Sequence, residues 1–146
     1  MMAWAKYIVA SFLALIILLA SSSAGLCGES EARMTYYRYI RALYYATKLE
    51  QVAPYWIRSS RIPFLEMKGS QAATQLARLK AGYVSNPRII TEVKQGNVVK
   101  MQGTGIVIDN GQKVNATVDV IMFYEDGVWR VQYTSWRGQV VRPLGT

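Results

Sequence analysis

The spacing of apolar residues changes at Asn86-Pro87, and this change limits the chain to few architectures. Before it, apolar side chains recur every three to four residues, as on one face of an amphipathic helix. After it, they alternate with polar side chains, as in half-buried strands. Helices followed by an antiparallel meander predict an α+β domain in which the helices pack on one face of the sheet.

Three helical segments are predicted before the change. The longest covers residues 31–53 and ends before Pro54, which cannot continue a helix. At 100° per residue, its apolar arc consists of Tyr36, Ile40, Leu43, Tyr44 and Thr47. A turn or two is expected over residues 55–61, and a further helix over residues 70–82, where Gly82 is the expected stop.

Four strands are predicted after the change, separated by short segments that contain Gly with Asn or Asp, as tight reversals require. They cover residues 88–94, 98–108, 113–124 and 128–136. The face of the third strand toward the helices is expected to hold Val114, Ala116, Val118, Val120 and Met122. Trp129, Val131 and Tyr133 are expected to share one face of the last strand. Gly103 and Gly105 predict a bulge or bend that curves the sheet around a helix.

Three segments carry a family resemblance. The tail 120–136, VIMFYEDGVWRVQYTSW, together with LKAGYV at 79–84 and GTG at 103–105, resembles the nuclear transport factor 2-like superfamily, also called SnoaL-like or cystatin-like roll. The likeness is greatest to small exported bacterial members of unassigned function. It implies a cone-shaped roll of N-terminal helices on a curved four-stranded antiparallel sheet. It implies little about activity, because this fold hosts enzymes, transport factors, secretion-system subunits and immunity proteins.

Residues 7–28 form 22 consecutive positions without a charge, which predicts a signal peptide or an N-terminal membrane anchor. The favoured interpretation is cleavage after Ala24, because small residues follow an apolar core of signal-peptide length. A retained anchor is the alternative, since about 20 apolar residues span a bilayer and Lys6 fits the positive-inside rule. Residues 29–146 then form a single domain.

Lipidation of Cys27 is a third alternative for this segment, although the bulky Leu26 beside it is atypical of a lipobox. All three alternatives predict an exported, periplasmic protein, anchored in the inner membrane if the segment is retained. Because Cys27 is the only cysteine, no internal disulfide can form.

The chain has no histidine, which excludes Ser-His-Asp and Cys-His catalysis and an imidazole base. No metal site and no cofactor are predicted. In the enzymes of the superfamily that the chain resembles, an Asp, often with a His, lies inside the cone. Here the one weak catalytic candidate is Glu50, whose angle on the predicted helix places it beside the apolar arc. Its nearness to Pro54 favours the alternative that its carboxylate faces solvent.

Two kinds of binding site are predicted, and they lead to different functions. A pocket inside the cone would serve a small-molecule-binding protein or a SnoaL-like enzyme. Its expected lining is Tyr36, Ile40, Leu43, Tyr44, Val118, Val120, Trp129 and Val131. An open cavity with a buried Glu50 would favour this alternative, whereas a cone filled by its own side chains would favour binding through the surface.

The surface alternative rests on the basic, tyrosine-rich first half of the domain. The net charge is +8, and residues 28–88 carry ten Lys or Arg against four Glu. The expected binding surface consists of Arg33, Tyr37, Arg38, Arg41, Tyr45 and Lys48. Tyrosine and arginine are enriched at protein interfaces, although such tyrosines can also simply flank a core.

These observations predict a non-enzymatic exported protein-interaction module, with a subunit of an envelope or secretion assembly as its specific form. The expected partner is a protein, including a second copy of the chain bound through the open sheet face. The membrane is a partner through residues 7–28 if they are retained, and no nucleic acid is expected.

Overall fold

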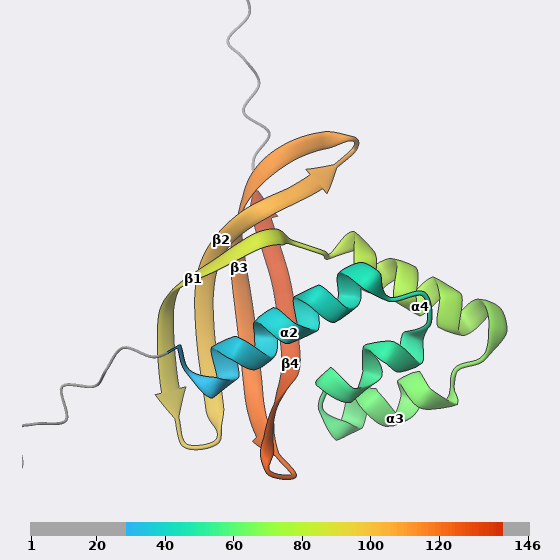
Figure 1. Cartoon of the computed structure of the whole chain (residues 1–146), viewed down its shortest axis with the longest axis horizontal. Coiled ribbons are helices and arrows are strands. Elements are labelled where there is room, and N and C mark those ends of the chain that lie inside the picture. Colours follow the sequence, from blue (N-terminus) through green and yellow to red (C-terminus); the bar gives the residue numbers. More distant parts are fainter. Residues whose placement is uncertain (1–28, 139–146) are drawn as a thin grey trace, which may run out of the picture.

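The structure, a computed structural model, describes residues 29–138 of the 146-residue chain. Helices precede strands, and the strands form one antiparallel sheet in the order β1-β2-β3-β4 (Figure 1). The elements are α2 (Glu31–Tyr45), η1 (Leu49–Gln51), η2 (Ala53–Tyr55), α3 (Arg58–Glu66), α4 (Gly69–Ala81), β1 (Ser85–Gln95), β2 (Val98–Asp109), β3 (Gln112–Glu125) and β4 (Val128–Gly138). The predicted α+β class is confirmed.

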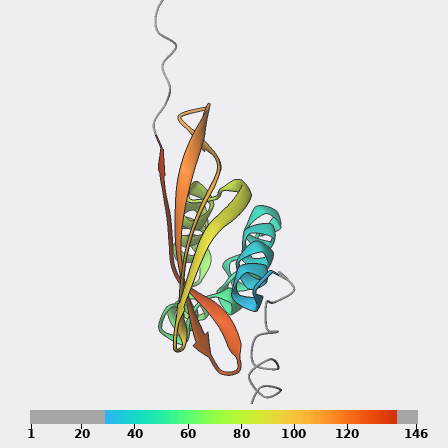
Figure 2. The ribbon, with the colours of Figure 1, turned by 90° about the vertical axis from the view of Figure 1, so that its left-hand side faces the viewer.

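Helix α2 lies across one face of the curved sheet, and α3 and α4 lie beyond the edge formed by β4 (Figures 1 and 2). The two short 3₁₀ helices connect these parts. Trp56, just after η2, forms a parallel bridge with Val131 of β4, and the Ile57 amide donates to the Val131 carbonyl at 3.1 Å. The segment after η2 therefore covers part of the β4 edge.

Helix α2 begins at a side-chain cap and ends earlier than predicted. Ser30 accepts a hydrogen bond from the Arg33 amide at 3.1 Å. The helix stops at Tyr45, and the expected continuation to residue 53 is wrong. Ala46 is extended, and Gln51 Oε1 accepts from the amides of Thr47, at 2.7 Å, and Lys48, at 3.0 Å. This reversal turns the chain back, so that the apolar residues of η1 and η2 join the core.

The later helices agree in place with the prediction but differ in extent. Where a turn or two is expected over residues 55–61, helix α3 begins at Arg58 and continues to Glu66, with Pro63 inside the helix. Helix α4 packs one apolar side onto the core through Leu76, which is buried. Lys80, on the same helix, is exposed.

The inner face of the sheet is as predicted. The five alternate residues of β3 expected toward the helices are all buried: Val114, Ala116, Val118, Val120 and Met122. They pack with the buried side of α2 and with residues of η1 and η2 in one core. Burial of this alternating face specifies the register, because a slip of one residue would turn the whole set to solvent.

The prediction for β4 is wrong at one position. Tyr133 was expected on the same face as Trp129 and Val131, but it is 49% exposed. The register shifts there, since Met122 pairs with Val131 while Ile121 pairs with Tyr133. The extra residue between them is a β-bulge, which moves every later side chain of the strand to the opposite face.

Gly103 accounts for the shape of the β1 edge. A Cβ at this position would lie 2.3 Å from the carbonyl oxygen of Arg88, so only glycine permits this approach of β1. The register shifts that curve the sheet lie in β1, between Ser85 and Arg88 and between Ile89 and Thr91. The expected bulge thus occurs in β1, opposite the glycines of β2.

Among residues 29–138, no helix has both the length and the apolar character needed to cross a membrane. The predicted signal or anchor segment 7–28 and Cys27 lie outside the described residues, as do residues 139–146.

Trp129 and Tyr133 of β4 are expected to respond differently to truncation. Trp129→Ala removes a core side chain and is expected to lower the free energy of unfolding by about 3 to 5 kcal/mol. Tyr133→Ala acts on the outer face and is expected to cost less than about 1 kcal/mol. Urea denaturation of both variants checks this, and equal losses would contradict the bulge.

Candidate functional site

The residues predicted to line a pocket in the cone are instead packed core. Seven of the eight are buried, and none of these is more than 7% exposed: Tyr36, Ile40, Leu43, Val118, Val120, Trp129 and Val131. They belong to one cluster of mutually packed side chains. The eighth, Tyr44, is 59% exposed and lies outside this cluster, so the prediction that places it in the cone is wrong.

Two tyrosines of α2 occupy the centre of this core. Tyr36 and Tyr39 are 0% and 1% exposed, and their ring centroids are 6.3 Å apart. Burial raises the pKa of Tyr36 from 10.0 to about 12, and the nearby Thr134 side chain opposes the shift without reversing it. Burial also raises the pKa of Tyr39. Both phenols are therefore held in the neutral form.

Glu50 does not lie beside the apolar arc of α2. The helix ends before this residue, so the helical angle on which its catalytic candidacy depended does not apply. Glu50 is exposed in η1. Within residues 29–138, no group of three or more His, Cys, Asp or Glu side chains is placed to hold a metal ion.

The predicted binding surface separates into two sets. Arg38, Arg41, Tyr45 and Lys48 are exposed, and all but Lys48 belong to α2. Arg33 and Tyr37 instead attach α2 to β1. The Arg33 guanidinium lies 3.3 Å from the Glu92 carboxylate, and the Tyr37 hydroxyl accepts a hydrogen bond from the Ile89 amide at 3.2 Å. These two side chains are engaged within the fold.

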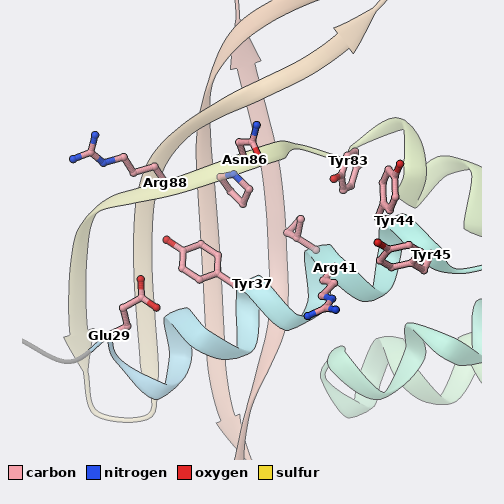
Figure 3. A pocket seen from close by; sticks show the side chains of 10 residues that line it. Glu29, Tyr37, Arg41, Tyr44, Tyr45, Tyr83, Asn86 and Arg88 are labelled. Carbon is pink, nitrogen blue, oxygen red and sulfur yellow. The ribbon is translucent and has the colours of Figure 1, made fainter.

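A groove of about 710 Å³ lies beside the exposed set, between α2 and the start of β1 (Figure 3). Its lining is Glu29, Tyr37, Ile40, Arg41, Tyr44, Tyr45, Tyr83, Asn86, Pro87 and Arg88. Sequence reasoning found Arg41 and the tyrosines of α2 but missed the residues from Tyr83 to Arg88. In the sequence, residues 79–84 and Asn86-Pro87 indicate the fold class, and nothing in them indicates a binding site.

Three tyrosines gather at one end of the groove (Figure 3). The ring of Tyr44 lies 4.9 Å from that of Tyr45, edge to face, and 5.5 Å from that of Tyr83. Tyr44 and Tyr45 are 59% and 69% exposed. Burial and the two neighbouring tyrosines raise the pKa of Tyr83. Mutual packing thus holds large aromatic surfaces at the protein exterior.

The opposite end of the groove is polar and charged. Asn86 has a left-handed backbone, with φ of 49°, and precedes Pro87 and Arg88 where the pairing of β1 is irregular. Asn86 and Arg88 also line a second hollow of about 440 Å³, over β2 and β3. Its other lining residues are Thr104, Gly105, Ile106, Asn115, Ala116 and Thr117. Asn115 and Thr117 alternate with the buried residues of β3, so the second hollow lies on the outer face of the sheet, and the start of β1 separates it from the groove.

The arginines at the groove have no acidic partner in the described part of the chain. No ion pair there includes Arg41 or Arg88, and Glu29 is the one carboxylate in the lining. Arg58 and Arg61 differ, because Asp126 in the β3–β4 turn lies 3.1 and 3.5 Å from them. That second basic group is used to hold α3 against the sheet.

Comparison with known proteins finds structural similarities but no sequence match. No protein-family model matches the chain, and no curated protein has a similar sequence. Solved structures similar to it include Rd1NTF2_05, an NTF2-like designed protein with five substitutions, and a calcium/calmodulin dependent protein kinase II association domain from Xanthomonas campestris. The helices and the curved, unclosed four-stranded sheet match the expected architecture.

Both similarities are distant. The designed protein is 13% identical, and the match covers 71% of this chain and 91% of the other, with a TM-score of 0.46. The association domain is 17% identical, and the match covers 82% and 95% of the two chains, also with a TM-score of 0.46. Function therefore has to be argued from the site.

The buried tyrosines predict that stability falls in alkali. In the unfolded chain Tyr36 ionises near its ordinary pKa of 10.0, whereas in the folded protein it stays neutral to about 12. The unfolded state therefore binds fewer protons between these values, and the free energy of unfolding is expected to fall as pH rises from about 10 to about 12. Urea denaturation across this range checks the expectation.

The control is Tyr36→Phe with Tyr39→Phe, which keeps the rings and removes both titrating groups. The alkaline fall should become clearly shallower in this double variant. An unchanged pH profile would mean that neither hydroxyl is buried in its neutral form.

Proposed function

We propose that this protein is a non-enzymatic, exported protein-interaction module that binds a partner through the exposed end of α2 and the adjoining groove. The observation that carries the proposal is the separation of the aromatic residues of one helix. Tyr36 and Tyr39 fill the cone, while Tyr44 and Tyr45 are exposed beside Arg41. The interior is used for packing, and the exterior offers an aromatic and basic surface.

This surface has the composition of a protein-binding site. Tyrosine buries a large area at low cost in conformational entropy, because it has only two side-chain torsions. Arginine forms two parallel hydrogen bonds with a carboxylate. Arg38 and Arg41, one turn apart on α2, are exposed together with Tyr45. A partner that carries carboxylates fits this combination.

The alternative function is a small-molecule-binding protein or a SnoaL-like enzyme that uses the cone. It requires a cavity at the positions of Tyr36, Leu43 and Val118. These side chains are at most 1% exposed and pack together, so they fill that volume. Glu50, its one acidic candidate, is exposed in η1. The surface function is favoured because it needs no rearrangement of the core.

A second copy of the chain is also a candidate partner, through the outer face of the sheet. This face carries exposed apolar side chains, among them Val93 on β1, at 55% exposed, and Tyr133 on β4, at 49%. Such a dimer would leave α2 and the groove accessible, since α2 lies on the other face of the sheet (Figure 2). Both contacts fit a subunit of an envelope or secretion assembly.

Export is tested by the N-terminus and intact mass of the protein recovered from the envelope fraction of its native host. A mature start at Gly25 in a soluble product is the expected result, because cleavage after Ala24 is the favoured interpretation of residues 7–28. An intact Met1 in the membrane, or a lipid on Cys27, would identify an anchored subunit. Recovery from the cytoplasm alone would contradict export.

Partner binding is tested with a photo-crosslinking amino acid placed at Tyr45 in the native host. We expect a protein adduct at this position, and we expect it to be lost when Arg38→Glu and Arg41→Glu are added. The matched control places the same amino acid at Ser59, which is exposed on α3 and distant in sequence from the groove. Absence of a protein adduct at Tyr45, or equal adducts at both positions, would contradict the proposal.

A further inference from the structure

We infer that the groove binds an extended acidic peptide segment, which lies along α2 from the tyrosine cluster toward Arg88. This inference rests on the proposed function and specifies the chemistry of its partner. The tyrosine cluster is Tyr44, Tyr45 and Tyr83, and it is taken to hold an aromatic, apolar or proline side chain of the peptide.

The shape of the site favours an extended ligand. The tyrosines lie at one end of the groove and Arg88 at the other (Figure 3). Asn86 and Arg88 also line the second hollow, which lies on the outer face of the sheet. Volumes of about 710 and 440 Å³ exceed what one side chain fills. A chain segment of several residues fits the groove.

The charge of the site favours carboxylates. Arg41 and Arg88 are exposed, and neither forms an ion pair within residues 29–138. Lys80 lies close to the tyrosine cluster, since its Nζ is 3.5 Å from the Tyr44 carbonyl oxygen. Glu29 is the one carboxylate in the lining of the groove. An acidic segment would therefore meet unopposed positive charge along most of its length.

The concave form of the site favours a peptide over an anionic membrane. The floor includes Ile40, which is 5% exposed, and Tyr37, which is half-buried. A bilayer surface is flat on this scale and would contact the rim but not the floor. A peptide side chain can enter the groove and contact both.

Recognition is expected through side chains, and not through addition of a strand to the β1 edge. β1 is an edge strand, so strand addition would need free amide donors there. Along the groove these donors are missing, because Pro87 has no amide hydrogen and the Ile89 amide donates to the Tyr37 hydroxyl. Charge and aromatic contacts should therefore determine affinity.

The test selects ligands for the full-length protein in mild detergent from a random twelve-residue peptide library. We expect enriched peptides to combine Asp or Glu with an aromatic residue or proline. For the most enriched peptide, fluorescence anisotropy should show at least about tenfold weaker binding to Arg88→Glu and to Arg41→Glu, since a hydrogen-bonded charge pair contributes about 1.5 to 3 kcal/mol. Tyr45→Ala should also weaken it.

The matched control is Lys100→Glu, which changes charge equally at an exposed position of β2 that lines neither hollow. It should bind within about twofold of the wild type once the general loss of one cation is screened at 0.15 M salt. Arg88→Gln removes the charge without reversing it and should give an intermediate loss. Unchanged thermal unfolding of each variant shows that the fold is retained.

Three results would overturn the inference. One is enrichment of neutral or basic peptides. Another is an acidic peptide that binds Arg88→Glu and Arg41→Glu as well as the wild type. The third is binding of phosphatidylglycerol vesicles, weakened by the same variants, with no peptide enriched. If the protein adduct at Tyr45 forms and persists in Arg88→Glu, the proposed interaction function stands and the acidic-peptide inference fails.

Discussion

The packing of one face of α2 on the inner face of the sheet is the contact on which the rest of this structure depends. Tyr36, Tyr39 and Leu43 are each at most 1% exposed, and they meet the alternating apolar face of β3 and β4. With no internal disulfide available, this burial is the main source of stability. It also fills the space that a ligand pocket in the cone would need, so the sites left for function lie outside it.

The same helix is attached sideways to β1, and this second attachment forms the groove. Tyr37 and Arg33 bind β1 near the start of α2, through Ile89 and Glu92. Toward the other end of α2 no such bonds to β1 occur in the described residues, and the tyrosine cluster and Arg41 border an open space. The absence of a Cβ at Gly103 lets the Arg88 backbone approach β2. The position of Arg88 thus follows from packing within the sheet.

The strands and their inner face could be predicted from the sequence because alternation is a local property, and burial of one face enforces it. The end of α2 could not, since helical periodicity continues past Ala46 and the reversal depends on one side chain, Gln51. Tyr133 was misplaced because a bulge changes the phase of a strand without a sequence signal of its own. The groove was missed because Tyr83 and Arg88 meet α2 only in the tertiary structure.

The early end of α2 has a further consequence for the exposed tyrosines. A helix continued to residue 53 would carry its apolar arc onward, and Tyr44 and Thr47 would lie on the core side. Because the chain reverses after Tyr45, Leu49 and Val52 return to the core from another direction and are buried there. Tyr44 is then left outside, where Tyr45 and Tyr83 pack against its ring. The exposed aromatic cluster is thus a product of the same reversal that completes the core, which ties the candidate binding surface to the stability of the fold.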